Sequence, residues 1–331
     1  MNPKMTIPSV MKLIRNNLIV VGILALVIAT SIIEPRFLSG MNFQNVVRQF
    51  GTLIFVALGM TFVIMGGFID LSVSGIISLV VVVTVTLIDP IGQVNAIIVG
   101  ILVGLACGLI TSFVVVTGGA LTLAESLFVT FGLGLVYAAL ALMITKGVTT
   151  YLNYSKTPYT LFTLIGRGSI GPISVSFFLF LACLLILYII ESRTHIGRSI
   201  VLIGENKVAS RLAGIPISRT VVFIYAVSGV MSAIGAIVLV SRVYLASPVI
   251  GGTVGGGYET QAIIATVVGG TALKGGRGSV LWTVIGTLVL ILMNNSLDLI
   301  GVSTYVQYVL RGVILILAIW LDNKKQITEG T

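Results

Sequence analysis

The chain has 331 residues, of which 57% are hydrophobic and only 9% are charged, and its mean hydropathy is +1.15. So few polar side chains cannot coat a soluble globule of this length, which excludes an ordinary soluble enzyme or binding domain. The formal net charge of +9 is scattered over loops and forms no basic stripe with interleaved aromatic residues, so it does not indicate nucleic-acid binding. Membrane lipid is therefore the expected solvent for most of the chain.

Apolar runs long enough to cross a hydrocarbon core of ~30 Å recur along the whole sequence. We predict an all-α polytopic membrane protein with about ten transmembrane helices, near residues 18–33, 49–66, 71–88, 94–117, 120–143, 173–191, 220–240, 257–271, 280–299 and 304–321. The first run follows Lys4, Lys12 and Arg15, and we interpret it as an uncleaved signal anchor because the later spans need no separate export signal. In the eighth run, glycines precede only about 14 apolar residues, so a broken or re-entrant helix is the alternative there.

Ten spans place both termini on one side, and the basic residues indicate that this side is the cytoplasm. In this orientation the inner segments carry twelve of the 19 lysines and arginines and the outer segments carry six, while Arg311 lies inside a span. Residues 1–17 are then a cytoplasmic N-terminal segment and residues 322–331 a cytoplasmic tail. Residues 18–321 form the transmembrane domain, which includes a cytoplasmic loop at 192–219.

Glycine recurs inside the spans, as at Gly100, Gly104 and Gly108 of the fourth. Small residues at a four-residue spacing let helices approach closely in lipid. We therefore predict tight helix packing along this stripe and no ligand role for it.

Residues 64–75 separate the second apolar run from the third and place Asp70, Ser72 and Ser74 at a predicted membrane boundary. Polar groups are costly in lipid and usually have a purpose there. A role in a translocation path is one interpretation. The other is a polar turn in which Asp70 or Ser72 caps the third helix, and local physics alone favours the turn.

A second glycine-rich break spans residues 269–279, but it is not a phosphate-binding loop, because its lysine precedes the glycine pair and its flanks are membrane helices. The sequence also contains no His-Glu-x-x-His metal motif, no Gly-x-Ser-x-Gly elbow and no nucleophile paired with its single histidine. We therefore expect no enzymatic activity, cofactor or metal on this chain. Any ATP hydrolysis must take place on another chain.

The cytoplasmic loop contains a predicted short helix from residue 206 to 213, with Asn206 as its N-cap and Gly214 as its stop. One face is apolar and includes Val208, and the other face is basic. A solvated connector is one interpretation, and a helix that docks into a groove of a partner is the other. The docking segment would consist of Gly204, Asn206, Lys207, Ala209, Arg211, Leu212 and Gly214.

Four polar residues lie inside the predicted spans, namely Glu125, Asn294, Asn295 and Arg311. We expect Arg311 to pair with Asp298 or Glu259, because an unpaired buried guanidinium is far too costly. Adjacent asparagines point in different directions on a helix, so at most one of them can line a pathway, where its amide would suit sugar hydroxyls. Helix-to-helix hydrogen bonding is the equal alternative for this pair.

Taken together, these motifs resemble the permeases of ATP-binding-cassette importers for ribose, galactose, xylose and related solutes, and the resemblance covers almost the whole chain. A motif similar to Gly-Gly-Ile-Asp-Leu-Ser-Val-Gly is matched at residues 66–75, with Phe68 inserted and Ser74 before the last glycine. Residues 204–215 look like the family's ATPase-docking segment, and residues 265–279 and 305–312 are also similar. The eighth span differs from the usual Glu-Leu-Asp pattern by having Gln261 in place of the second acid.

The resemblance implies a permease of the bacterial inner membrane that moves a sugar or a sugar-like solute. Its implied partners are cytoplasmic ATPase subunits that bind ATP and Mg, a second permease copy or paralogue, and an extracytoplasmic solute-binding protein. The candidate translocation-path residues are Asp70, Ser72, Ser74, Glu125, Glu259, Gln261, Asn294 and Asn295. Two alternatives stay open: an ion-coupled secondary transporter that uses midplane carboxylates, and a permease of the same family for a nucleoside or another non-sugar solute.

Overall fold

The computed structural model describes residues 18–170, 173–252 and 257–329, and these residues are almost entirely helical. In chain order the helices are α2 (Leu18–Ile33), α3 (Gly40–Met65), α4 (Val73–Ile91), α5 (Gln93–Thr117), α6 (Leu123–Thr145), α7 (Thr160–Arg167), α8 (Val175–Arg193), α9 (His195–Glu205), α10 (Lys207–Leu212), α11 (Ile217–Val243), α12 (Tyr258–Val268), α13 (Val280–Leu299) and α14 (Thr304–Glu329). The predicted all-α class is confirmed, while the predicted segment 1–17 lies outside the described residues.

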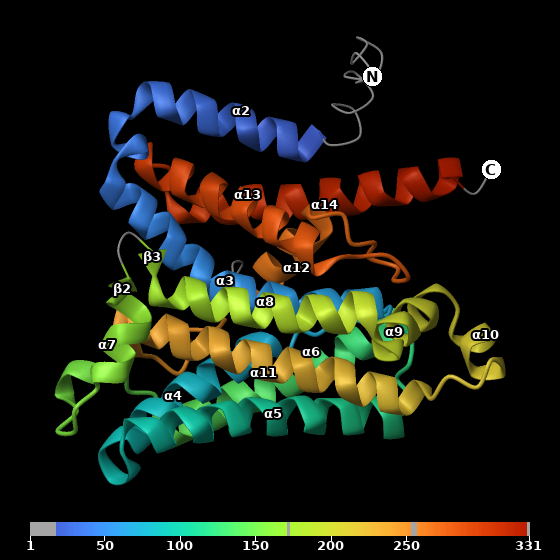
Figure 1. The fold of residues 1–331 in the computed structure, drawn as a ribbon, viewed down its shortest axis with the longest axis horizontal. Coiled ribbons are helices and arrows are strands. Elements are labelled where there is room, and N and C mark those ends of the chain that lie inside the picture. The colour runs from blue at the N-terminus through green and yellow to red at the C-terminus, as the bar shows by residue number, and fades with distance from the viewer. Residues whose placement is uncertain (1–17, 171–172, 253–256, 330–331) are drawn as a thin grey trace.

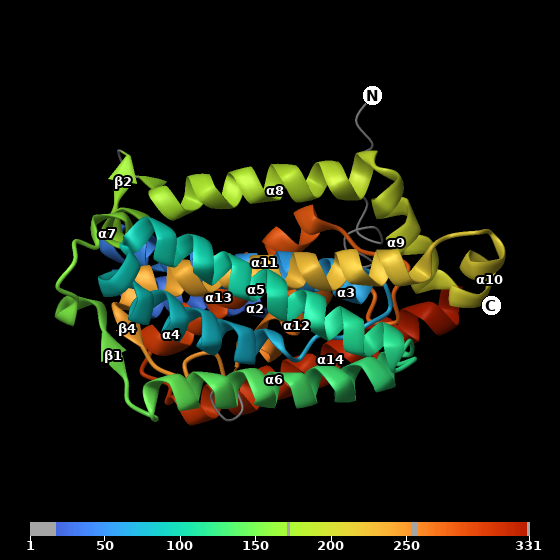
Figure 2. The same cartoon turned by 90° about the horizontal axis from the view of Figure 1, so that it is seen from below.

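The long helices run side by side in one bundle, which Figures 1 and 2 show from two perpendicular directions. Helix α7 and the short strands lie at one end, called here the α7 end. Helices α9 and α10 lie at the opposite end, called the α10 end, where α14 also ends (Figure 1). Helix α14 continues to Glu329 without a break, so the predicted boundary at residue 321 is not marked by a change of structure.

Seven of the described helices are long and apolar enough to cross a membrane: α3, α4, α5, α6, α8, α11 and α13. The apolar parts of α2 and α14 are shorter, at Val21–Ile33 and Thr304–Trp320. The prediction of a full eighth span at 257–271 is wrong, because α12 has only 11 residues and is roughly 16 Å long at 1.5 Å per residue. The alternative of a broken helix at this position agrees with the structure.

The centre of the bundle is formed by α3 and α11. Every residue of α3 from Phe50 to Met65 is buried, and α11 is buried along most of its length. By contrast, α5, α6 and α8 expose large apolar side chains, such as Phe128 at 72% and Met143 at 74% of their surface. Outward apolar faces of this kind are stable in lipid and not in water, which agrees with the composition.

The predicted glycine stripe lies where α5 crosses the neighbouring helices. A Cβ atom added at Gly108 would lie 2.3 Å from the carbonyl oxygen of Tyr225 in α11, and one added at Gly229 would lie 2.2 Å from that of Gly104. Gly100 faces Thr84 of α4 in the same way. The prediction of tight helix packing is therefore confirmed.

The α7 end contains several short elements between and beyond the long helices. Strand β1 (Thr150–Tyr151), followed by the 3-10 helix η2 (Leu152–Tyr154), pairs antiparallel with β4 (Leu245–Ala246) beyond α11. Strands β2 (Ser169–Ile170) and β3 (Ile173–Ser174) form a second antiparallel pair. Helix α7 packs so closely on α11 that a Cβ atom at Gly166 would lie 1.9 Å from the Ser241 oxygen.

Candidate functional site

Helix α10 at the end of the bundle carries an uncovered apolar face. The Asn206 side chain accepts a hydrogen bond of 2.9 Å from the Ala209 amide, and Gly214 follows the helix with a φ of +78°. The predicted N-cap and the predicted stop are therefore both confirmed. Val208 and Leu212 are 71% and 85% exposed, so this short helix presents its apolar side chains outward. The 11-residue helix α9 that precedes it was not predicted.

Lys207 does not share an outer basic face with Arg211, as the sequence suggested. Its Nζ atom points into the bundle, donates hydrogen bonds to the carbonyl oxygens of Gly67 at 3.2 Å and of Leu121, and lies 4.0 Å from the Phe68 ring centroid. Burial lowers the pKa of this ammonium group to about 8, and the charge of Glu125 acts in the opposite direction. Arg211, in contrast, is exposed.

The break between α3 and α4 buries a carboxylate. Oδ1 of Asp70 accepts hydrogen bonds from the amide of Ser72 at 2.9 Å and from its hydroxyl at 2.6 Å, and Oδ2 accepts one of 2.7 Å from Ser228. Ser72 stands at the N-cap position of α4, but its side chain makes no cap hydrogen bond. Ser228 lies roughly 16 Å along α11 from its start, so Asp70, which is 1% exposed, is buried inside the bundle.

Two hydroxyl groups of α6 support this break and were not recognised from the sequence. The Ser126 oxygen accepts a hydrogen bond from the Ile69 amide at 3.3 Å, and the Thr130 oxygen accepts one from the Leu71 amide at 3.0 Å. Non-helical backbone at membrane depth needs such partners, since lipid provides none. The four-residue spacing of these hydroxyls, which places them on one helix face, was the available signal.

A second polar group lies where α12 begins. Glu259 is in the first turn of α12 and takes a hydrogen bond from Ser74 near the start of α4, so the structure brings these two candidates together. Its Oε2 atom is buried and has no hydrogen-bond partner among the described residues. Gln261 is half-buried in the same turn. A half-helix whose N-terminus and carboxylate lie inside a bundle is the type of discontinuity that lines substrate sites in transporters.

The two asparagines of α13 make contacts between helices. Asn294 accepts a hydrogen bond of 3.2 Å from Nε of Arg311 in α14, and Asn295 exchanges two amide hydrogen bonds of 2.8 and 2.9 Å with Asn42 in α3. Among the described residues Arg311 makes its side-chain hydrogen bond to Asn294, while Asp298, one of its two predicted partners, lies near it and accepts a hydrogen bond from Gln307. These contacts agree with the helix-to-helix alternative.

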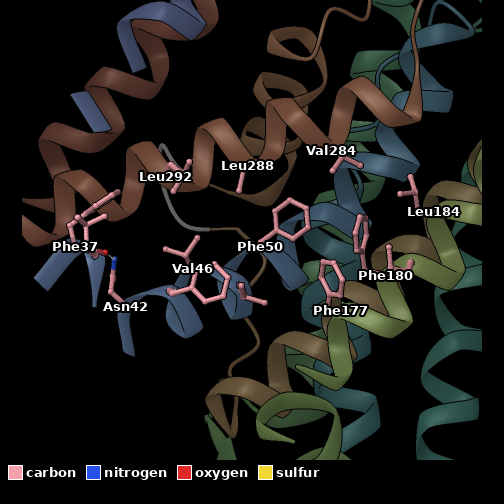
Figure 3. Close-up of a pocket in the computed structure, with 14 residues that line it drawn as sticks. Phe37, Asn42, Val46, Phe50, Phe177, Phe180, Leu184, Val284, Leu288 and Leu292 are labelled. Carbon is pink, nitrogen blue, oxygen red and sulfur yellow. Dashed lines mark hydrogen bonds between the residues drawn. The ribbon is translucent and has the colours of Figure 1, made fainter. Parts of the chain in front are cut away.

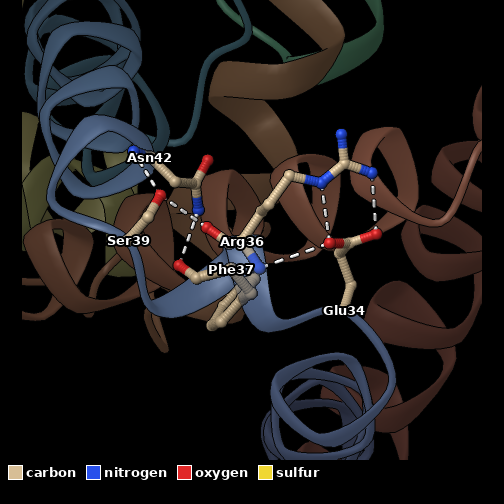
Figure 4. Close-up of polar contacts among 5 residues, drawn as sticks. All are labelled: Glu34, Arg36, Phe37, Ser39 and Asn42. Carbon is tan, nitrogen blue, oxygen red and sulfur yellow. Dashed lines mark hydrogen bonds and ion pairs between the residues drawn. The ribbon is translucent and has the colours of Figure 1, made fainter.

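Asn42 is held in place by the chain that enters α3. Its amide donates to the Phe37 carbonyl at 2.9 Å, and its backbone nitrogen donates to the Ser39 hydroxyl at 3.2 Å (Figure 4). The same short connection contains the 3-10 helix η1 (Pro35–Leu38) and a bidentate ion pair between Arg36 and Glu34. The Nε atom of Arg36 lies 2.8 Å from Oε1 of Glu34. Hydrogen bonding to Arg36 lowers the pKa of Glu34 to about 2.

The amide pair gives a direct test of helix-to-helix bonding. The Asn295→Leu variant leaves the Asn42 amide buried without its hydrogen-bond partner on α13. We expect this variant to lose about 1–3 kcal/mol of stability. The double variant Asn42→Leu/Asn295→Leu should lose less than the sum of the two single variants, because no amide is then orphaned. Thermal unfolding in detergent measures all three, and strictly additive losses would contradict the coupling.

Glu125 does not lie within the membrane interior, so its prediction as an in-membrane path residue is wrong. It forms a capping box at the start of α6, where its Oε2 accepts from the Thr122 amide at 2.9 Å and from the Thr122 hydroxyl at 2.7 Å. The side chain is exposed at the α10 end, near Lys207. Its role in the fold is to satisfy the first backbone amides of α6.

A large hollow of about 630 Å³ lies between α3, α8 and α13, nearer the α7 end. Figure 3 shows phenylalanine and aliphatic side chains on all sides, including Phe50, Phe177 and Phe180. Its only polar lining side chain, Asn42, is already bonded to Asn295. A hollow of this composition suits hydrocarbon and not a hydroxyl-rich solute, so it does not mark the polar substrate site.

An apolar helical bundle with a buried polar break, an internal half-helix and a short helix that exposes apolar side chains outside the spans defines an integral membrane transport protein. A family model described as a branched-chain amino acid transport system / permease component matches residues 42–319. The chain belongs to this family of importer permeases. It is therefore a multi-pass membrane protein and a transport subunit, not an enzyme.

Curated relatives agree with this assignment. The chain is 36% identical to the ribose import permease protein RbsC of Bacillus subtilis (strain 168), over 92% of this chain and 91% of the relative. It is 32% identical to RbsC of Escherichia coli (strain K12), over 92% and 93%. The L-arabinose transport system permease protein AraH of Escherichia coli (strain K12) is also 32% identical, over 92% and 90%. No solved structure gives a significant match.

Proposed function

We propose that the chain is the membrane-spanning subunit of an ATP-driven importer that moves a sugar or sugar-like solute into the bacterial cell. The observation that carries this proposal is the uncovered apolar face of α10, with Val208 and Leu212 exposed on a helix outside the spans. Such a face fits the hydrophobic groove of a partner. That partner is an ATP-binding-cassette ATPase, which binds ATP and Mg on its own chain, and the α10 end then faces the cytoplasm.

The remaining partners follow from the same proposal. A second copy of the chain or a paralogue completes the pathway, and a solute-binding protein delivers the solute at the α7 end. The named relatives support a sugar, since they are ribose and L-arabinose permeases. Glu259 supports a hydroxyl-rich solute, because its buried Oε2 atom, which has no hydrogen-bond partner among the described residues, can accept a hydrogen bond from a hydroxyl group. Asp70 is less suited to bind a solute hydroxyl, since its carboxylate already accepts three hydrogen bonds, two from Ser72 and one from Ser228.

The ion-coupled alternative has lost part of its support. Glu125, the carboxylate that favoured it, is a capping residue at the end of a helix. Ion-coupled carriers need acids at a central site that an ion can reach. ATP dependence therefore separates the two functions most directly.

The test is solute uptake by the chain reconstituted in vesicles with its ATPase and its binding protein. We expect uptake of ribose or L-arabinose to require ATP on the side of the membrane where the ATPase is bound. Uptake should persist when sodium and proton gradients are collapsed. A nucleoside and leucine, included in the same panel, identify the solute class. Uptake driven by an ion gradient after ATP depletion, or repeated purification of the chain without an ATPase, would contradict the proposal.

A Glu259→Ala variant extends the experiment to the solute site. If the Oε2 atom of Glu259 binds a solute hydroxyl, uptake should fall by about tenfold or more, the effect of losing one hydrogen bond to a charged group. The variant should still co-purify with the ATPase, because Glu259 is not part of the exposed apolar face of α10. Unchanged uptake would remove Glu259 from the solute site while leaving the ATP-driven function standing.

A further inference from the structure

Three glycine-containing segments meet backbone to backbone beside the docking helix. They are the α3–α4 break at Gly67, the last turn of α9 at Gly204, and the α12–α13 connection at Gly275 and Gly276. A Cβ atom at Gly204 would lie 2.0 Å from the Met65 oxygen and 2.4 Å from the Gly276 nitrogen, and one at Gly275 would lie 2.8 Å from the Gly67 Cα atom. No side chain can therefore separate the three backbones.

Hydrogen bonds hold this junction together. The Gly276 amide donates to the Met65 oxygen over 2.9 Å, which joins the α12–α13 connection to the end of α3. Gly67, Gly275 and Gly276 all have positive φ angles, of +74°, +92° and +79°. Since side chains rarely adopt that conformation, both the close approach and the turns require glycine at these places.

Lys207 adds a second connection from α10 to the same break. Its ammonium group binds the Gly67 carbonyl and lies over the Phe68 ring, while its bond to the Leu121 carbonyl reaches the α5–α6 connection. The side chain is half-buried, so these contacts are shielded from water in part. A cation bonded to two backbone oxygens and one aromatic face makes a firm link between α10 and the bundle.

These links reach the two interrupted elements of the bundle, which are the α3–α4 break and the half-helix α12. Gly67 is three residues before Asp70, whose carboxylate joins the break to α11 through Ser228. The α12–α13 connection follows directly from α12, and the first turn of that half-helix carries Glu259. Movement of α9 and α10 would therefore reach Asp70 through three residues of backbone and Glu259 through the length of the half-helix α12.

We infer that Gly204 and Lys207 are positioning residues that transmit movement of the docking helix to the α3–α4 break and to α12. This inference rests on the proposed function and specifies which elements of the bundle the ATPase moves. It assigns to Lys207 a contact with the bundle, and leaves ATPase binding to the exposed apolar face of α10.

The test uses the full complex of the chain, the ATPase and the binding protein in lipid vesicles. We expect Lys207→Met to co-purify with the ATPase and to keep the basal rate of ATP hydrolysis. Stimulation of hydrolysis by solute-loaded binding protein, and uptake, should each fall about tenfold, the effect of losing one charge-assisted hydrogen bond. Lys207→Arg keeps the charge and the donors and should recover most of both activities.

Gly204→Ala tests the same link without changing the lysine. Its methyl group would push the end of α9 away from Met65, and the same separation of basal hydrolysis from uptake is expected. Gly132→Ala is the control, because a Cβ atom there meets nothing within 4 Å. A simple loss of stability would lower all activities together and would not be rescued by Lys207→Arg.

Two results would overturn the inference. One is uptake at the wild-type rate by both Lys207→Met and Gly204→Ala. The other is loss of ATPase binding by Lys207→Met, which would make Lys207 a docking residue. Failure of the wild-type chain itself to bind an ATPase would instead count against the proposed function. Failure of the inference is therefore seen in the variants, and failure of the proposed function is seen in the wild type.

Discussion

Leu212→Asp is expected to release the chain from its ATPase while leaving it folded in the membrane. Leu212 is the more exposed of the two large apolar residues of α10 and lies on its apolar face with Val208. Burying a leucine side chain in a partner is worth about 1.5–3 kcal/mol, and an aspartate in the same groove adds the cost of desolvating a charge. We therefore expect the ATPase to bind at least about tenfold more weakly, measured by co-purification from detergent at graded ATPase concentrations.

Two further variants define what this result means. Val208→Asp should give the same loss, because it alters the same face. Val148→Asp places the same charge on an exposed valine of the loop after α6 and should leave ATPase binding unchanged. Equal recovery of the ATPase with Leu212→Asp and with wild type would show that α10 is not the docking helix.

Gly229→Leu is expected to prevent the bundle from assembling. Even a Cβ atom at this position would lie 2.2 Å from the Gly104 oxygen and 3.0 Å from the Gly108 backbone, so α5 and α11 would have to move apart. Overpacking a buried site costs about 1–3 kcal/mol, and more where backbone must shift. We expect little folded protein after extraction, measured by size-exclusion chromatography, and a lower unfolding temperature for what remains.

Gly132→Leu is the matched control for this experiment. It makes the same substitution within a helix, on the exposed side of α6, where an added Cβ atom meets no neighbour. It should extract and unfold like the wild type. If the two leucine variants behaved alike, the close crossing of α5 and α11 would not be what holds these helices together.

Features that depend on local chemistry were predictable from the sequence. The α10 helix follows from an asparagine that caps it and a glycine that ends it, and both act on backbone groups a few residues away. The glycine spacing in α5 predicted close packing for a similar reason, since it is a property of one helix face. Helix positions followed from apolar runs of membrane length.

Features that depend on how helices turn toward one another were not predictable. Lys207 and Arg211 are equivalent by composition, yet only Lys207 meets carbonyl groups from two other connections. Arg311 pairs with an asparagine because Asn294 faces it, whereas Asp298 is engaged by Gln307. Glu125 lies at a helix terminus that an apolar run alone could not locate within a few residues. In each case the deciding partner lies on a different segment of the chain.

The shortness of α12 also constrains how the protein is made. A segment of 11 residues is too short to be recognised as a membrane span by itself, and its unpaired terminal amides would be costly in lipid. It packs mainly against α13 and α3, and also against α14 and α4. Helix α12 must therefore enter the membrane together with helices synthesised after it. The part of the chain from α12 onward is then inserted as a unit, late in biogenesis, and a ribosome that stops before α13 leaves this half-helix without a place to fold.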